Sequence, residues 1–107
     1  MNLKEKHCVA CEGGALPLNK EQAQSYLKMT LGWALNEEGK KISREFKFKD
    51  FVEAMEFVNS VAKIAEAEGH HPDIHVFYNR VMIELWTHAI NGLSENDFIV
   101  AAKINEL

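Results

Sequence analysis

The stretch DFVEAMEFVNSVAKIAEAEG, residues 50–69, predicts the longest helix of the chain. Asp50 can cap its first turn, and Glu53 stands three residues later, which is the spacing of a capping box. Gly69 is a natural stop, because glycine readily adopts the left-handed conformation that ends many helices. Apolar side chains recur every three or four residues and form one face, made of Phe51, Met55, Val58, Val61, Ala62 and Ala65. Such a face has to pack against another layer of the fold.

Strand patterns lie on both sides of this helix. The segment before it, WALNEEGKKISREFKFKD (residues 33–50), predicts a hairpin that turns at Gly39. Its second half alternates apolar with polar residues, and Arg44 is the imperfect member of the apolar set. The segment after it, residues 73–88, predicts two further strands, DIHVFYN and VMIELWTH, joined near Asn79.

Two more helices complete the pattern. Asn19 and Gln22 have the spacing of a capping box and predict a helix over about residues 20–29, and Ser94 with Asp97 predicts a last helix near the C-terminus. The order helix, strand, strand, helix, strand, strand, helix predicts an α+β fold. We expect a four-stranded antiparallel sheet with the three helices packed on one face.

Length and composition favour a single globular domain. The chain has 107 residues, of which 47% are hydrophobic, and its net charge of −4 argues against a nucleic-acid-binding protein. No apolar run approaches the length of a membrane span, and the first residues lack a secretory signal, so a cytoplasmic protein is expected. Residues 1–18 show no periodicity and are expected to form an N-terminal tail, with residues 19–107 as the single domain.

The tail contains the short motif HCVAC, residues 7–11. His7, Cys8 and Cys11 supply at most three local ligands, and no second cysteine pair follows them. The motif does not follow a predicted strand, as a thioredoxin-like motif would. We therefore expect free thiols and no metal site.

Two adjacent histidines follow the long helix, in EGHHPD, residues 68–73. Gly69 lets the chain leave the helix sharply, and Pro72 favours an extended backbone at His71, so together they make a stiff corner. Neighbouring residues of an extended segment point in opposite directions, so His70 and His71 are expected to do different jobs. Imidazole can donate or accept a proton near neutral pH. The alternative is a pair of surface histidines without a chemical role.

Side chains around this corner leave alternatives open. Glu66 lies at the border of the apolar face and is either a solvated glutamate or the orienting partner of a neighbouring imidazole. Glu68 is expected well outside that face. His88 is expected to end the last strand beside Trp86, on a face that is a site wall, an interface or solvent-exposed. His75 has no evident partner, and no special role is expected for it.

Taken together, these residues have the order and spacing of a family signature. The residues of this signature are Glu66, His70-His71-Pro72, Tyr78, His88 and Asp97, and the number of residues between them also matches the signature. On this signature the chain resembles the pterin-4a-carbinolamine dehydratase family. The segments GW (32–33), FKFKDF (46–51) and GLSENDF (92–98) are also similar to family segments. The resemblance covers about residues 19–107.

The resemblance implies both a fold and an activity. Family members have a four-stranded antiparallel sheet with three helices on one side, dimerise through sheet edges, and in some cases form tetramers. The implied activity is a hydro-lyase reaction, the dehydration of 4a-hydroxytetrahydropterin to quinonoid dihydropterin. This reaction recycles a tetrahydrobiopterin-type cofactor after aromatic amino-acid hydroxylation, which implies coupling to such a hydroxylase. It requires neither a metal nor an organic cofactor.

The resemblance also implies roles for individual residues. His70 and His88 are the acid and base, in an order that the sequence leaves open, and His71 positions the substrate and assists. Glu66 and Asp97 support and orient the imidazoles. Trp33 and Trp86 are expected to stack on the flat pterin ring, and Thr87 to contact the substrate through its backbone or hydroxyl group. The remaining expected binding and supporting residues are Gly69, Pro72 and Ala89.

Two other functions remain as alternatives. Animal members of the family also act as dimerisation cofactors of a homeodomain transcription factor, so a scaffolding module is the second hypothesis. Such a module would use an exposed helix surface and not the histidines. The third hypothesis is a pterin-binding partner in molybdopterin metabolism, which would keep the pterin site without the link to a hydroxylase.

Overall fold

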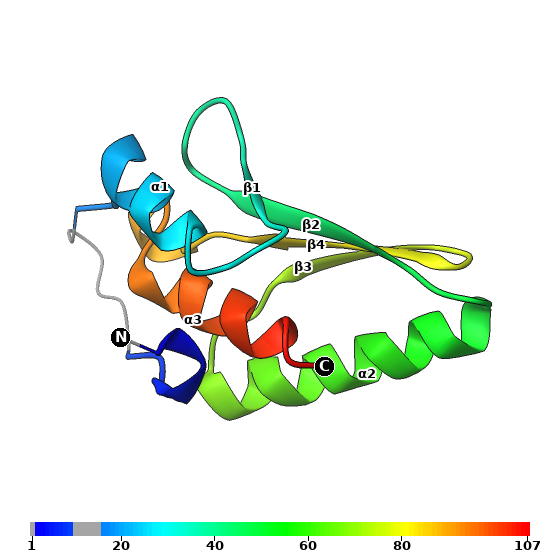
Figure 1. Cartoon of the computed structure of the whole chain (residues 1–107). Coiled ribbons are helices and arrows are strands. Elements are labelled where there is room, and N and C mark those ends of the chain that lie inside the picture. Colours follow the sequence, from blue (N-terminus) through cyan, green and yellow to red (C-terminus); the bar gives the residue numbers. More distant parts are fainter. Residues whose placement is uncertain (1, 10–15) are drawn as a thin grey trace.

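The structure, a computed structural model, describes residues 2–9 and 16–107. Four strands form one antiparallel sheet in the order β1-β2-β4-β3 (Figure 1). Hairpins join β1 to β2 and β3 to β4, and β2 pairs with β4 in the middle of the sheet. The strand bounds are β1 Ala34–Leu35, β2 Ile42–Lys47, β3 Asp73–Phe77 and β4 Arg80–Leu85.

Helices cover one side of this sheet. In Figure 1, α2 and α3 lie beneath the strands, and α1 packs beside α3 near β1. Their bounds are α1 Lys20–Leu27, α2 Phe51–Glu68 and α3 Glu95–Ile104, and two short 3-10 helices are η1 Leu3–Glu5 and η2 His88–Ile90. The predicted α+β fold, with a four-stranded antiparallel sheet and three α-helices, is therefore confirmed. Within the described ranges, none of these helices has the length and apolar character needed to cross a membrane.

The most deeply packed helix is α3. All of its residues except Glu95 and Lys103 are buried. A helix that is buried nearly all round needs neighbours on several sides, and α3 contacts α1, α2 and η1. Phe98 stacks on Tyr26 of α1 with 4.9 Å between the ring centroids. The first turn of α3, which carries Asp97, is consequently shielded from solvent.

Both ends of α2 follow the sequence prediction. The side chain of Asp50 accepts the N–H of Glu53 at 2.9 Å, and Gly69 takes a φ of 65° as the C-cap. The apolar face is only partly as predicted. Phe51 and Ala62 are exposed, because the buried face of α2 is rotated toward Ala54, Val61 and Ala65.

The last residue of α2 corrects a further expectation. Glu68 was expected outside the buried face, yet its side chain is only 6% exposed, whereas that of Glu66 is 77% exposed. One oxygen of Glu68 accepts the N–H of Cys8 at 2.7 Å, and the other lies 3.4 Å from Nζ of Lys103. Burial alone would raise the pKa of Glu68, but hydrogen bonds from Cys8, His7 and Lys103 hold this pKa below its ordinary value.

The described N-terminal residues pack along α3. Leu3 is buried in the hydrophobic core, and Nζ of Lys103 donates to the backbone carbonyl of Lys4 at 3.0 Å. Lys6 forms an ion pair with Glu95 at 2.9 Å. Residues 2–9 are thus attached to the domain through several separate contacts.

The HCVAC motif is only partly within the described chain. Burial, followed by the charge of Glu68, raises the pKa of the Cys8 thiol to about 12, so this free thiol stays protonated at neutral pH. Cys11 lies outside the described residues. Among residues 2–9 and 16–107, no three His, Cys, Asp or Glu side chains are grouped so that they could hold a metal ion.

The strand that precedes η2 is shorter than predicted. β4 ends at Leu85, and the backbone N–H of Thr87 then bonds to the carbonyl of Gly92 at 2.8 Å in an isolated bridge. His88 does not end the strand, as expected, but begins η2. The bridge pairs Thr87 with Gly92 outside the sheet, a contact that the alternation of apolar and polar residues does not indicate.

Replacing Glu68 with Gln should lower the free energy of unfolding by about 2 kcal/mol at neutral pH, since a charged acceptor of several hydrogen bonds is lost. The pKa of Glu68 is lower in the folded chain than its ordinary value of 4.5, so its charge stabilises the fold fully above that pH. This contribution disappears as the pH falls through the lower, folded value. Urea unfolding of both proteins at neutral pH and at about pH 3 measures the difference, which should shrink in acid.

The matched control is Glu66→Gln, in the same helical turn but exposed. It should change the free energy of unfolding by less than about 0.5 kcal/mol. Equal losses in the two variants would contradict a structural role for the Glu68 carboxylate.

Candidate active site

A cavity of about 470 Å³ opens where the C-terminal end of α2, the start of β3 and η2 meet. It brings together most of the site residues that the sequence predicted. Its lining consists of Val9, Gly69, His70, His71, Pro72, Asp73, Trp86, Thr87, His88, Ala89 and Asn96. A larger cavity of about 540 Å³ lies at the other end of α3. There Arg44 and Asn105 bond to each other at 2.7 Å, and no histidine lines it.

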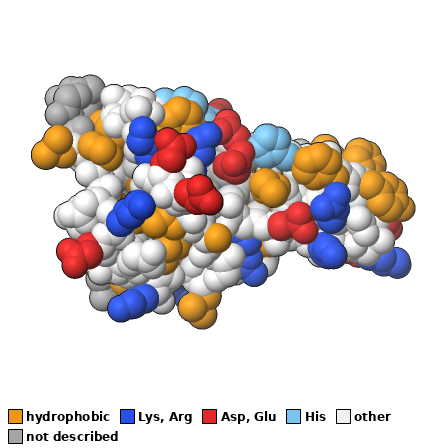
Figure 2. All heavy atoms as spheres, turned by 90° about the horizontal axis from the view of Figure 1, so that it is seen from above, with side chains coloured by type: hydrophobic (Ala, Val, Ile, Leu, Met, Phe, Trp, Pro, Cys, Tyr) orange, Lys and Arg blue, Asp and Glu red, His pale blue; other side chains and the backbone are white. Residues whose placement is uncertain are grey.

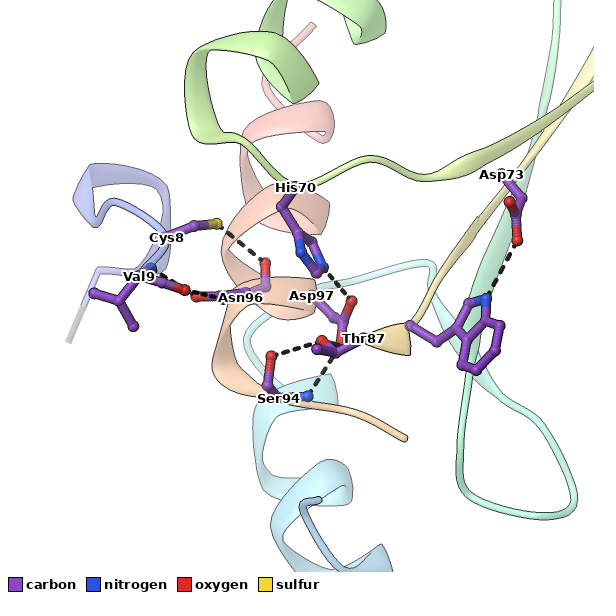
Figure 3. A network of polar contacts seen from close by, with 9 residues as sticks. Cys8, Val9, His70, Asp73, Thr87, Ser94, Asn96 and Asp97 are labelled. Atoms are coloured by element: carbon purple, nitrogen blue, oxygen red, sulfur yellow. Dashed lines mark hydrogen bonds and ion pairs between the residues drawn. The ribbon is translucent and has the colours of Figure 1, made fainter. Parts of the chain in front are cut away.

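His70 is the inward-facing histidine of the pair. Gly69 turns the chain out of α2, and the N–H of His70 still bonds to the carbonyl of Ala65 at 3.2 Å. The imidazole is only 13% exposed, and its Nε2 lies 2.6 Å from Oδ1 of Asp97 (Figure 3). A carboxylate can only accept, so Nε2 carries the proton of this bond. In the neutral ring, Nδ1 is therefore left with a lone pair that can accept a proton.

Asp97 is a fully buried carboxylate with three donors. Besides His70, its Oδ2 accepts the hydroxyl of Thr87 at 2.8 Å and the N–H of Ser94 at 3.0 Å. The hydroxyl of Ser94 lies 2.8 Å from that of Thr87 and continues the network (Figure 3). A buried charge is stable only when donors surround it, so this network also fixes the orientation of the imidazole.

Thr87 lines the cavity beside His88. Its hydroxyl donates to Oδ2 of Asp97, and its backbone N–H donates to the carbonyl of Gly92. The expected contact of Thr87 with a substrate stays a prediction, and the structure adds a bond by which Thr87 supports the carboxylate of Asp97.

His71 faces the other way, as its extended backbone predicted. Its Nε2 pairs with Oε2 of Glu66, and both side chains are exposed. Glu66 is thus solvated, as one alternative had it, and it also pairs with a neighbouring imidazole, which is that of His71 rather than His70. The two adjacent histidines thus occupy different environments, one buried beside a fixed carboxylate and one exposed to solvent.

His88 reaches the same cavity from η2. Its ring stacks on the indole of Trp86, with 3.9 Å between centroids and 29° between planes. Nε1 of Trp86 donates to Oδ2 of Asp73 at 3.3 Å, and Nζ of Lys41 lies 4.9 Å from the centre of the same indole. Trp86 is thereby fixed at the cavity wall, and it holds the exposed imidazole of His88 in place.

Some residues singled out in the sequence do not line the cavity. Glu66 and Asp97 bond to histidines that line it, whereas three others lie elsewhere. Trp33 is buried in the core, where its indole donates to Oδ1 of Asn105 at 2.8 Å, so it does not form the expected wall. Tyr78 lies in the turn between β3 and β4 with a φ of 53° and is exposed. His75 pairs with Glu84 at 2.8 Å, a partner that the sequence reading did not identify.

Three lining residues were not predicted as part of the site, namely Val9, Asp73 and Asn96. The side-chain oxygen of Asn96 accepts the N–H of Val9 at 3.1 Å, and its amide nitrogen donates to the carbonyl of Val9 at 2.6 Å (Figure 3). Asn96 could have been suspected, because it precedes Asp97 in the capped first turn. Nothing in the local sequence of Val9 indicates that it contacts the site.

Comparisons with known proteins agree on one family. A family model described as pterin 4 alpha carbinolamine dehydratase matches residues 16–107. A protein of Halorhodospira halophila is 46% identical over 107 residues, which covers 100% of this chain and 98% of its own length. A protein of Nitrosomonas eutropha is 50% identical over 107 residues, with 99% and 93% covered. Both are provisionally named as pterin-4-alpha-carbinolamine dehydratases.

Two solved structures are similar as well. A protein of Brucella melitensis, described as a transcriptional coactivator/pterin dehydratase, has a TM-score of 0.79 and 38% identity, with 84% of this chain and 96% of that chain covered. A pterin dehydratase-like protein described as a RuBisCO assembly factor has a TM-score of 0.60 and 21% identity, with 70% and 87% covered. The second similarity concerns the fold alone.

The hydrogen bond to Asp97 makes a prediction about His70 that does not depend on any activity. In the neutral ring, the proton should reside on Nε2 in the native protein, and Asp97→Asn should shift it toward Nδ1 because the charged acceptor is lost. Ring ¹⁵N chemical shifts measured by NMR above the titration range report the two tautomers. The ring shifts of His75, which pairs with Glu84, serve as the internal control and should not change. An unaltered tautomer at His70 would mean that Asp97 does not orient it.

Proposed function

The chain belongs to the pterin 4 alpha carbinolamine dehydratase family, and we propose that it dehydrates 4a-hydroxytetrahydropterin to quinonoid dihydropterin. One observation supports this activity above the others. The cavity gathers His70, His71 and His88 from two separate segments, and the first of these is anchored on the buried carboxylate of Asp97. A site of this kind suits a reaction that consists of two proton transfers.

The reaction removes water across the C4a–N5 bond. The C4a–O bond breaks, the leaving hydroxyl takes up one proton, and N5 gives up one proton as the carbon–nitrogen double bond forms. No net proton is gained or lost, and no electron is exchanged. The site therefore has to supply one acid and one base at neutral pH, each of which contributes about 100-fold or more.

His70 is the base in this proposal. Its Nε2–H is committed to Asp97, so Nδ1 is the atom that accepts the N5 proton. The imidazolium that forms is stabilised by the fixed negative charge of Asp97, which Thr87 and Ser94 hold in place.

His88 is the acid. Its ring is exposed, so bulk water can return a proton to it between turnovers, and its stacking on Trp86 limits its orientations. His71, oriented by Glu66, positions the pterin at the mouth of the cavity. Gly69, Pro72 and Ala89 shape the walls, and Trp33 has no part in substrate binding because it is buried elsewhere.

The remaining expectations extend the proposal to the cellular context. β1 and β3 are the edge strands of the sheet, and an edge can pair with a second copy to form a homodimer, with a tetramer as a further step. A free thiol such as Cys8 is suited to the reducing cytoplasm. The dehydratase would recycle a tetrahydrobiopterin-type cofactor beside an aromatic amino-acid hydroxylase, without a metal or organic cofactor of its own.

A protein-binding role is the second candidate function. Figure 2 shows hydrophobic side chains gathered at the end of the molecule where β3 and β4 join. The exposed residues there are Phe77 at the end of β3 and Tyr78 of the turn, with Phe51 and Val52 at the start of α2. A pull-down with the wild-type protein and with its His70→Ala variant tests this role. A protein partner that binds both equally well would support it, and a partner from molybdopterin metabolism would be one such protein.

Decay of the 4a-carbinolamine, followed in the presence of a trap for the pterin product, tests the dehydratase proposal. The purified protein should accelerate the decay, and His70→Ala and His88→Ala should each lower the acceleration by about 100-fold or more, since each removes one proton-transfer group. His75→Ala is the matched control, because His75 lies outside the cavity, and it should retain the wild-type rate. A wild-type rate equal to that of buffer would refute the proposal.

A further inference from the structure

We propose that Val9 is a specificity-determining residue, whose side chain contacts the bound pterin and sets how large a ring substituent the cavity admits. The inference rests on the proposed dehydratase function, because it names a substrate contact for that reaction. It assigns Val9, which the sequence placed in a tail, to the wall of the site.

The backbone of the segment that carries Val9, residues 7–9, is fixed by three hydrogen bonds. The N–H of Cys8 donates to Glu68 at the end of α2 at 2.7 Å. The amide side chain of Asn96 bonds to both the N–H and the carbonyl of Val9, at 3.1 and 2.6 Å (Figure 3). All three bonds are made by backbone atoms of the segment, so its path does not depend on the identity of the side chain at position 9.

Within this segment, only Val9 has a side chain available to a substrate. The thiol of Cys8 is turned toward α3, where it lies 3.6 Å from the carbonyl of Asn96, and its pKa of about 12 keeps it protonated. The imidazole of His7 is bonded to Glu68. Val9 lines the cavity together with the three histidines, and it is 73% exposed.

The exposed apolar side chain of Val9, at the edge of a polar cavity, can pack against the flat ring of a bound pterin. Val9 lines the same cavity as the three histidines and lies on its Asn96 side in Figure 3, so a pterin that fills the cavity has Val9 at one edge. Covering the exposed isopropyl group removes apolar surface from water, which favours binding without taking part in proton transfer. Its effect is therefore expected in KM and not in kcat.

The distance between this wall and the base is set within one helical turn. Asn96, which holds Val9, and Asp97, which holds His70, are neighbours in the first turn of α3. Because both anchors belong to the same buried turn, we expect the gap between the side chain of Val9 and the imidazole of His70 to vary little. A gap of fixed width discriminates between substrates by the size of their substituents.

The test measures steady-state kinetics of Val9→Ala and Val9→Phe with two 4a-hydroxytetrahydropterins, one with a methyl and one with a dihydroxypropyl group at C6. Val9→Ala should raise KM about fivefold for both substrates while kcat stays within about twofold, since it removes contact area only. Val9→Phe should narrow the gap and raise KM for the larger substrate about tenfold more than for the methyl substrate. Both changes leave the backbone hydrogen bonds of the segment intact.

Val52→Ala and Val52→Phe are the matched controls, because Val52 is also an exposed valine but does not line the cavity. Both should keep the wild-type KM for both substrates. If the Val9 variants also keep it while the wild-type enzyme is active, the specificity role is overturned and the dehydratase function stands. If the wild-type protein fails to accelerate the reaction, both proposals fall.

Discussion

The buried carboxylate of Asp97 connects three segments of the chain, of which the one that carries His70 is the most distant in the sequence. It accepts hydrogen bonds from Ser94 in its own helix cap, from Thr87 beyond β4 and from His70 beyond α2. A charge without access to water is tolerated only when its donors are all in place, so these three segments have to converge in one arrangement. The packing of α3 under the sheet makes that convergence possible, and the candidate active site lies where it occurs.

The stiff corner after α2 divides two identical side chains between two environments. His70 points inward to the buried carboxylate of Asp97, and His71 points outward to the solvent-exposed carboxylate of Glu66. An imidazole in the first environment keeps one orientation and one tautomer, whereas in the second it can follow a ligand. The pattern is consistent with a site in which moving a proton and holding a substrate are separate tasks.

Much of the fold follows from local rules, because caps, turns and strand alternation depend on residues close in sequence. The Asp50 cap and the Gly69 stop are as predicted for that reason. What depends on distant partners could not be predicted. Glu68 is buried by the N-terminal segment, and Trp33 is drawn into the core by Asn105, although neither partner is near in the chain. For the same reason the sequence did not predict Val9 as a site residue, because its position at the cavity depends on a hydrogen bond to Asn96, near the other end of the chain.

Placing both anchors in the first turn of α3 has a consequence for fluctuations of the folded state. Helix ends are the parts of a helix that open most readily, and amide hydrogen exchange detects such openings as cooperative events. An opening of this turn would break the bonds of Asn96 to Val9 and of Asp97 to His70 together, while Cys8 would stay bonded to Glu68 of α2. Amide hydrogen exchange in the first turn of α3 would therefore report on the anchors of both sides of the site at once.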